Sequence, residues 1–301
     1  MTIIGSACAK TILFGEHAVV YDEPAVAIPL INTRTTAELI PNQDSFSVQS
    51  DKAEINCSFD EIPKESGLYR LLLELMKEFE VSELPLLTLK IRSDIPIASG
   101  LGSGAALSAA VIRAFSGYFG RVLDKETVNR MVYEIEKIYH GTPSGIDNTV
   151  IVYEQPLIFT KNSGFSPLKA DLSKFPLLVG DSGIRSSTAA VVNDVRSHIR
   201  QNERYLHEIG DLVRKAENAL TIGDLTETGR LMNENHELLK LIGVSCPELD
   251  ELTSLALKNG AYGAKLTGAG RGGNFIVLCK DSLHAISIKK MYENRGVHVI
   301  L

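Results

Sequence analysis

The sequence predicts an α+β fold that is divided into two domains. Its 301 residues are enough for one large or two medium domains. The first half mixes short strand-like segments with helices, a run of helical patterns spans residues 188–259, and the end returns to strand, helix and strand. This mixed order is typical of α+β proteins and differs from the regular alternation of a doubly wound sheet.

The elements of the first half follow from local patterns. Short apolar and β-branched runs predict strands at residues 11–14, 25–31, 36–40 and 86–91. Apolar residues at helical spacing predict helices over residues 68–79, over 107–115, and from 123 to about 139, the last with Asp124 as N-cap. Residues 151–159 predict a β-hairpin.

A domain boundary is expected near residues 161–164, which gives domains at residues 1–161 and 162–301. Residues 177–180 predict a strand that opens the second domain. Helices are then predicted at residues 188–202, 203–221, 224–241 and 247–259. The chain ends in a predicted strand at 275–279, a helix at 282–294 and a strand at 297–301.

The composition limits the classes of function. A formal charge of -6 argues against nucleic-acid binding, which needs a basic face. No apolar run approaches the length of a membrane span, and the N-terminus lacks the basic start of a signal peptide. The four cysteines, Cys8, Cys57, Cys246 and Cys279, lack metal-binding spacing. Free thiols in a cytoplasmic protein are expected.

A glycine-rich segment, residues 99–106, leads into the alanine-rich helix. Three glycines before a helix start leave backbone N–H groups and the positive end of the helix dipole open to an anion. The segment is not a Walker loop, because no Lys-Ser or Lys-Thr follows the last glycine. It matches a dinucleotide fingerprint only weakly, since residues 92–96 separate it from the preceding strand. A glycine-rich turn that caps a core helix is the alternative.

Four segments together carry a resemblance to a known family. They are Ala9-Lys-Thr-Ile-Leu-Phe-Gly-Glu-His-Ala-Val-Val-Tyr21, the glycine-rich segment, His140-Gly-Thr-Pro-Ser-Gly-Ile-Asp-Asn148 and Lys265-Leu-Thr-Gly-Ala-Gly-Arg-Gly-Gly273. In order and spacing they resemble the GHMP kinases over nearly the whole chain. The strings at residues 15–21 and 143–148 are most similar to the mevalonate kinase branch. The resemblance implies an N-terminal domain like ribosomal protein S5 domain 2, a ferredoxin-like C-terminal domain, and an active site between them.

The resemblance implies a catalytic role for Asp147 and Lys10. Asp147 would orient the substrate hydroxyl and take its proton, and Lys10 would supply a cation that holds Asp147 ionised. Asp147 is expected at the start of an apolar strand. An Asx turn or cap for Asp147 and a snorkelling strand lysine for Lys10 are the alternatives.

Glu136 matches the family glutamate that ligates Mg²⁺, with Ser103 as a second metal or phosphate contact. Mg²⁺ takes few protein carboxylates and keeps waters, so one glutamate is sufficient. A solvated helix carboxylate is the alternative for Glu136, and Glu134 is the competing candidate.

The nucleotide cradle implied by the resemblance consists of Ser99, Gly100, Leu101, Gly102, Ser103, Gly104 and Ala105. The family usually has two serines where this chain has Ser103 and Gly104. The glycine puts one hydroxyl contact in doubt and leaves the backbone cradle intact. Arg271, in the second glycine cluster, stands where the family generally has glycine, and it would either reach the phosphates or point to solvent.

Glu16, His17, Val20 and Thr188 are the expected substrate contacts. The apolar residues 18–20 cannot pair several buried hydroxyls of a sugar and suit a short branched acid with a methyl group. A structural core histidine is the alternative for His17. Arg185 is a candidate partner for a substrate carboxylate, and helix capping is the alternative for it and for Thr188.

The resemblance thus implies ATP-dependent phosphorylation of the 5-hydroxyl of (R)-mevalonate, a step toward isopentenyl diphosphate, with Mg²⁺ as cofactor. The alternatives are a phosphomevalonate kinase, a mevalonate 3-kinase, a sugar kinase, or a non-catalytic sensor with the same fold. A phosphorylated acceptor would need extra Lys or Arg, and the sequence shows no such cluster. The family leaves a homodimer open.

Overall fold

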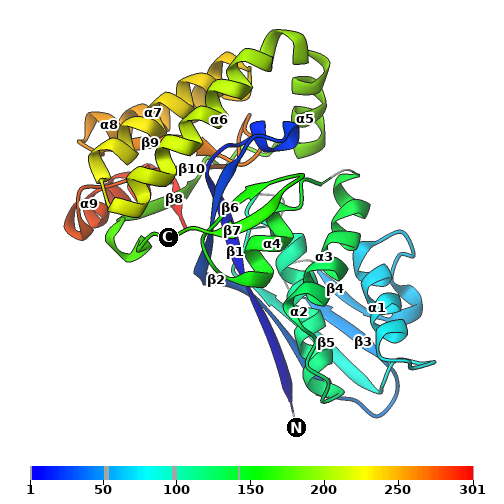
Figure 1. Cartoon of the computed structure of the whole chain (residues 1–301). Helices are drawn as coiled ribbons and strands as arrows, with labels where there is room; N and C mark the ends of the chain where they lie inside the picture. Colours follow the sequence, from blue (N-terminus) through cyan, green and yellow to red (C-terminus); the bar gives the residue numbers. More distant parts are fainter. Residues whose placement is uncertain (1, 51–53, 97–99, 142, 301) are drawn as a thin grey trace. The chain divides into compact units, whose positions relative to one another are not determined.

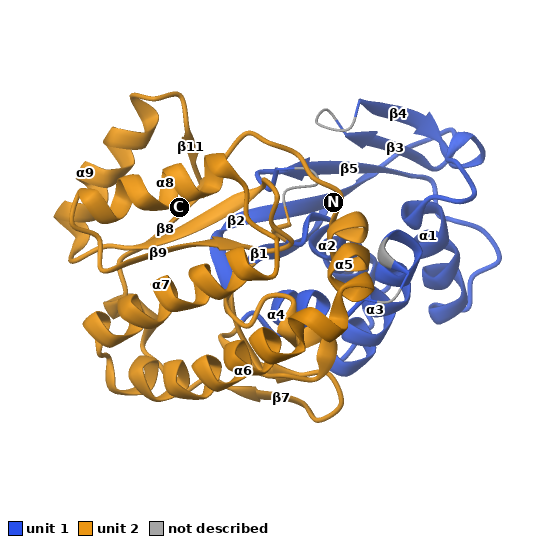
Figure 2. Cartoon of the chain, turned by 90° about the horizontal axis from the view of Figure 1, so that it is seen from above, with its two compact units in different colours: residues 1–10, 29–97, 102–154 blue, residues 11–28, 98–101, 155–301 orange. Residues whose placement is uncertain are grey.

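The computed structural model describes residues 2–50, 54–96, 100–141 and 143–300. The chain forms two compact units, coloured separately in Figure 2. Unit 1 comprises residues 1–10, 29–97 and 102–154, and unit 2 comprises residues 11–28, 98–101 and 155–301. The long strands β1 (Ile3–Phe14) and β2 (Ala25–Pro41) each contribute residues to both units. The predicted division into residues 1–161 and 162–301 stays a prediction.

Unit 1 combines a sheet with a group of helices. Its strands follow the order β4-β3-β5-β2, in which β3 runs parallel to β5 and the other pairs are antiparallel. The further elements are β3 (Ser47–Ser50), β4 (Ile55–Ser58), the 3-10 helix η2 (Phe59–Glu61), α1 (Gly67–Glu78), β5 (Leu87–Ser93), α2 (Ser103–Tyr118), α3 (Lys125–His140) and α4 (Ile146–Tyr153). Helix α2 packs against α1, α3 and α4, and Figure 1 shows these four helices grouped together.

Local chemistry explains where these helices begin. The Asp124 side chain accepts the Thr127 N–H at 2.7 Å, which confirms Asp124 as the predicted N-cap of α3.

Strand β1 lies so close to α2 that a Cβ at Gly5 would stand 2.1 Å from the Ala110 carbonyl oxygen. Only glycine allows this approach, which brings β1 against the helix that follows the glycine-rich turn.

Unit 2 contains a four-stranded antiparallel sheet in the order β11-β8-β10-β9. Helices α7 and α8 pack on β9, and α9 packs on β8 and β11. The elements are η1 (Ala18–Tyr21), β6 (Leu157–Thr160), β7 (Gly164–Pro167), η3 (Leu172–Lys174), β8 (Leu177–Asp181), α5 (Thr188–Ser197), α6 (Ile199–Ile222), α7 (Leu225–Leu241), α8 (Pro247–Lys258), β9 (Gly263–Thr267), β10 (Asn274–Leu278), α9 (Ser282–Glu293) and β11 (His298–Val299).

The structure corrects several predicted elements. Residues 25–31 and 36–40 belong to the single strand β2, and the break between α5 and α6 falls at His198 instead of near residue 202. The hairpin predicted at 151–159 is wrong: α4 extends to Tyr153 and strand β6 follows. The β-branched run from Thr149 to Val152 has high strand propensity, but all four residues are buried by the fold, and burial overrides propensity.

Among the described residues, no helix is both long enough and apolar enough to cross a membrane.

Candidate active site

Lys10 and Asp147 form an ion pair inside unit 1. Lys10 lies on β1, and its Nζ is 2.8 Å from Oδ1 of Asp147. The Lys10 side chain is 3% exposed, whereas that of Asp147 is 31% exposed. Asp147 stands in the first turn of α4, where the helix dipole favours a carboxylate, and not on the expected strand. The structure therefore brings the two predicted residues together, and Lys10 does not snorkel to solvent.

Glu136 is buried on α3 and interacts electrostatically with this pair. Burial, with the Asp147 carboxylate as the second cause, raises the pKa of Glu136 to about 7, and the Lys10 ammonium acts in the opposite direction. The competing candidate Glu134 is exposed, and it pairs with Lys137 Nζ at 2.7 Å. Of the two glutamates, only Glu136 thus shares an environment with Lys10 and Asp147.

The glycine-rich turn forms the N-terminal end of α2. Gly102 has φ +75° and precedes the helix, which begins at Ser103. A Cβ at Gly102 would meet Ile151 Cδ1 at 2.6 Å and Lys10 Cγ at 3.2 Å, so the turn lies directly against the lysine stem. A Cβ at Gly104 would stand 3.1 Å from Glu136 Oε1, which brings the first turn of α2 against that carboxylate.

Three residues of the predicted nucleotide cradle lie in this first turn of α2. The N–H groups of Ser103, Gly104 and Ala105 belong to the first helical turn, which its own helix cannot satisfy. Gly100 and Leu101 belong to unit 2. Ser99 lies outside the described residues.

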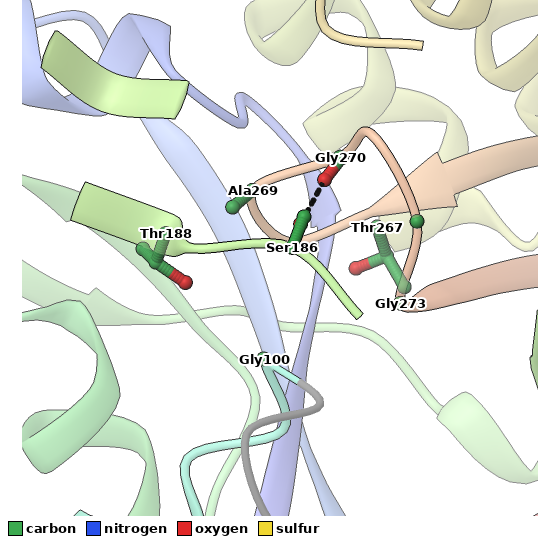
Figure 3. Close-up of a pocket in the computed structure, with 8 residues that line it drawn as sticks. Gly100, Ser186, Thr188, Thr267, Ala269, Gly270 and Gly273 are labelled. Atoms are coloured by element: carbon green, nitrogen blue, oxygen red, sulfur yellow. Dashed lines mark hydrogen bonds between the residues drawn. The ribbon is translucent and has the colours of Figure 1, made fainter. Parts of the chain in front are cut away.

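The second glycine cluster forms a loop, residues 268–273, between β9 and β10 in unit 2. Together with other parts of the same unit it lines a pocket that carries three hydroxyl-bearing residues, shown in Figure 3. The lining residues are Gly100, Ser186, Thr188, Thr267, Ala269, Gly270, Gly272 and Gly273. Ser186 Oγ donates to the Gly270 carbonyl oxygen at 2.6 Å, which holds the loop against the segment before α5. Backbone amides and hydroxyls of this kind suit an anionic or hydroxylated ligand.

Glu16 and His17 contact the same region of unit 2. Glu16 accepts from Lys265 Nζ, and both side chains are fully buried. His17 Nε2 lies 2.8 Å from the Ala269 carbonyl oxygen. Burial lowers the pKa of His17 to about 4, so its ring is neutral near pH 7. Both residues, predicted as substrate contacts, have protein partners.

The remaining predicted contacts differ in their surroundings. Val20 is half-buried in η1, and Thr188 is exposed at the first position of α5 and lines the pocket. The helix cap is Ser187, which accepts the Ala190 N–H at 3.3 Å. Arg185 forms a bidentate pair with Asp181 at 2.8 and 2.9 Å. Arg271, expected either at the phosphates or in solvent, pairs with Asp194, and its side chain is 40% exposed.

The family follows from two matched regions of the sequence. Residues 61–155 match the family model described as the GHMP kinases N terminal domain, and residues 212–298 match the one described as GHMP kinases C terminal. The chain belongs to the GHMP kinases. It is therefore an ATP-dependent kinase that acts on an alcohol, and the predicted two-domain α+β fold is confirmed.

Individual relatives agree with this family. The mevalonate kinase of Thermococcus gammatolerans is 35% identical over 306 residues, which cover 93% of this chain and 90% of that protein. The crystal structure of the Methanococcus jannaschii mevalonate kinase has a TM-score of 0.88 at 27% identity and covers 99% of this chain and 97% of the other. The L. major mevalonate kinase, solved in complex with R-mevalonate, has a TM-score of 0.82 at 31% identity, with coverages of 98% and 92%.

Lys265 and Thr267 are two site residues for which the sequence predicted no separate role. Both lie on β9 and are buried, and Lys265 holds Glu16 while Thr267 lines the pocket. A lysine within an apolar strand pattern was the available signal, because such a lysine needs a buried partner. Its partner, 249 residues away in the sequence, could not be found by spacing.

Proposed function

We propose that this GHMP kinase transfers the γ-phosphoryl group of ATP to the 5-hydroxyl of (R)-mevalonate. The observation that carries the proposal is the Lys10–Asp147 pair, in which a partly exposed carboxylate is held by a buried cation beside a glycine turn. Relatives named mevalonate kinase match this chain over nearly its full length, which supports the acceptor.

Asp147 acts as the residue that orients the acceptor hydroxyl and takes its proton. Its 31% exposure leaves the carboxylate accessible to a substrate, while the salt bridge from Lys10 restricts its orientation. Phosphoryl transfer needs mainly positioning and charge stabilisation, so one fixed base is a sufficient chemical group. The first-turn N–H groups of α2 bind phosphate oxygens, because they point along the helix dipole toward an anion.

Glu136 is the residue that would hold Mg²⁺. The donor chemistry fits: Glu136 and Asp147 are two carboxylates that interact with Lys10, and burial, with the Asp147 carboxylate as the second cause, raises the pKa of Glu136. A bound divalent cation would favour the ionised form of Glu136. When bound, Mg²⁺ neutralises charge on the phosphate oxygens. The hydroxyl of Ser103, at the first position of α2, would be a further oxygen donor to the metal or to phosphate.

The acceptor preference rests on residues 18–20. Ala18 and Val19 are fully or nearly fully buried, so the half-buried Val20 is the aliphatic side chain that this turn leaves accessible. Aliphatic surface suits the methyl group of mevalonate and leaves sugar hydroxyls without partners.

We also assign the enzyme to the cytoplasm, since its four cysteines are free, as is usual in a reducing compartment.

A coupled assay of ADP release tests the function. The wild-type chain with Mg·ATP is offered mevalonate, 5-phosphomevalonate, homoserine and galactose, and the product is examined by phosphorus NMR. Turnover with mevalonate alone and phosphate on the 5-hydroxyl are expected. Turnover with a different acceptor would refute the interpretation of residues 18–20. Nucleotide binding without turnover on any acceptor would favour a sensor.

A further inference from the structure

The glycine loop at residues 268–273 has few side chains with which to hold its own shape. Four of its six residues are glycines with positive φ, and Arg271 also has φ +53°. Such residues lose much conformational freedom on folding, so external contacts must fix the loop. On one side, a Cβ at Gly270 would stand 2.0 Å from the Val244 carbonyl oxygen, and Ser186 donates to Gly270.

The segment 11–17 supplies three contacts on the other side, all within unit 2. The first runs between two threonines. Thr267 Oγ1 donates to the Ile12 carbonyl oxygen at 2.7 Å, which uses its only proton. Thr11 Oγ1, 2.9 Å from Thr267 Oγ1, must therefore be the donor in that bond. These bonds fix the last residue of β9, directly before the loop.

The second contact is the ion pair of Glu16 and Lys265. Both residues have a relative exposure of 0%, and Lys265 Nζ also donates to the Leu266 carbonyl oxygen at 2.7 Å. A charge in this environment is strongly disfavoured without its partner, so each member holds the other in place. A fully buried carboxylate that already accepts from a lysine is poorly placed to bind an acceptor molecule.

The third contact is made by His17, whose Nε2 faces the Ala269 carbonyl oxygen at 2.8 Å. A carbonyl oxygen only accepts, so Nε2 carries the proton and donates. His17 has φ +61°, a conformation that costs energy for a residue with a side chain and is maintained by its surroundings. This bond reaches into the loop itself.

We propose that Thr11, Glu16 and His17 are positioning residues that hold the glycine loop in its ligand-binding shape through Thr267, Lys265 and Ala269. This assignment rests on the proposed function and replaces the expectation that Glu16 and His17 contact the acceptor. The loop residues and Ser186 remain the groups that face a ligand in the pocket.

The experiment compares single and paired replacements of the ion pair. Glu16→Gln leaves the buried Lys265 ammonium without a counter-charge, and Lys265→Met leaves the buried Glu16 carboxylate without its partner. The double variant Glu16→Leu/Lys265→Met replaces the pair by apolar side chains. Glu208→Gln, which opens the exposed pair with Arg204 in the same unit, is the matched control. Hydrogen exchange of residues 263–273 is measured without substrate, and kcat and the acceptor KM are measured separately.

In each single variant the backbone amide hydrogens of the loop are expected to exchange about 10-fold faster than in the wild type, and kcat is expected to fall by about 10-fold or more. The double variant should recover slow exchange and most of the lost kcat, with an acceptor KM within about 3-fold of wild type. The control should match wild type. A double variant with a protected loop but an acceptor KM raised about 100-fold would overturn the proposal, because Glu16 would then bind the acceptor.

The His17 variants give an independent test if the double variant does not fold. The amide N–H of His17→Gln can reach the Ala269 carbonyl, whereas His17→Ala cannot. Slow exchange and kcat should be retained in His17→Gln and lost in His17→Ala. Equal losses in both variants, with normal exchange in both, would contradict a positioning role. Because exchange needs no substrate, an inactive wild-type chain would count against the proposed function alone.

Discussion

Two lysine–carboxylate pairs, one in each unit, use the same chemical groups in opposite surroundings. In the Lys10–Asp147 pair of unit 1 the carboxylate is 31% exposed, whereas in the Glu16–Lys265 pair of unit 2 both side chains are 0% exposed. An accessible carboxylate with a fixed cation can meet a substrate and exchange a proton with it. A fully buried pair can only hold segments together, because removal of either charge leaves the other without solvation. Exposure, and not residue type, distinguishes the pair that we propose to be catalytic from the pair that we propose to be positioning.

The largest effect is expected at the exposed pair. Asp147→Asn keeps the shape of the side chain but removes the base, so kcat should fall by about 10³-fold. Circular dichroism and the thermal midpoint should remain close to wild type, because the amide oxygen can still accept from Lys10. The ADP-release assay measures the loss. Near-normal turnover in a folded Asp147→Asn enzyme would contradict the role of Asp147 as the base, and with it the proposed difference in function between the two pairs.

A second test addresses the carboxylate beside the exposed pair. Glu136→Gln should weaken binding of Mg·ADP by about 10–100-fold, since an amide is a poorer Mg²⁺ ligand than a carboxylate. Glu134→Gln, two residues away and exposed, is the matched control and should bind like wild type. Calorimetric titration with and without Mg²⁺ gives both values. Equal affinity in the two variants would exclude Glu136 as the metal ligand.

The approach of the glycine turn to Lys10 can be tested separately. Gly102→Ala introduces a Cβ 2.6 Å from Ile151 at a φ of +75°, so both crowding and backbone strain should lower the free energy of unfolding, by about 2 kcal/mol. At Gly120, φ is +63° and no heavy atom lies within 4 Å of the Cβ position, so Gly120→Ala measures the backbone cost alone. The difference between the losses of unfolding free energy in the two variants, measured by urea unfolding, gives the cost of the steric crowding at Gly102. Equal losses would mean that the turn can move away from Lys10.

The smallest effect concerns stability in mild acid. Burial lowers the pKa of His17 and of His236 to about 4, below the ordinary value near 6.5. Between these values the unfolded chain binds protons that the folded chain does not, so the free energy of unfolding falls as the pH falls from about 6.5 toward 4.

From pH 7.5 to pH 5.5 each histidine should contribute a decrease of about 1 kcal/mol. Urea unfolding at the two pH values measures the summed contribution of both histidines to the free energy of unfolding. In His17→Gln the decrease should be smaller by the contribution of His17. A chain that becomes more stable at the lower pH would show that these rings are not held neutral.

Local sequence was sufficient for the elements and residues with short-range signals. Asp124 was identified as a cap because capping depends on residues three positions apart, and α7 and α8 were predicted close to their observed bounds. The four motifs were sufficient for the family, whereas the roles of Lys10, Asp147 and Glu136 stay predictions. The helix predicted at residues 107–115 lies within α2, which begins earlier, at Ser103, directly after the glycine turn.

Long-range contacts decided the rest. The helix α4 replaced a predicted strand because burial outweighed the propensity of its β-branched residues. Glu16 and His17 were expected at the substrate, and their partners Lys265 and Ala269 lie about 250 residues further along the chain. Sequence spacing carries no information about such pairs, since only the folded chain brings them within hydrogen-bond distance and removes them from water. The sequence thus determined which groups are available for chemistry, and the tertiary structure determined which of them remain accessible to a substrate.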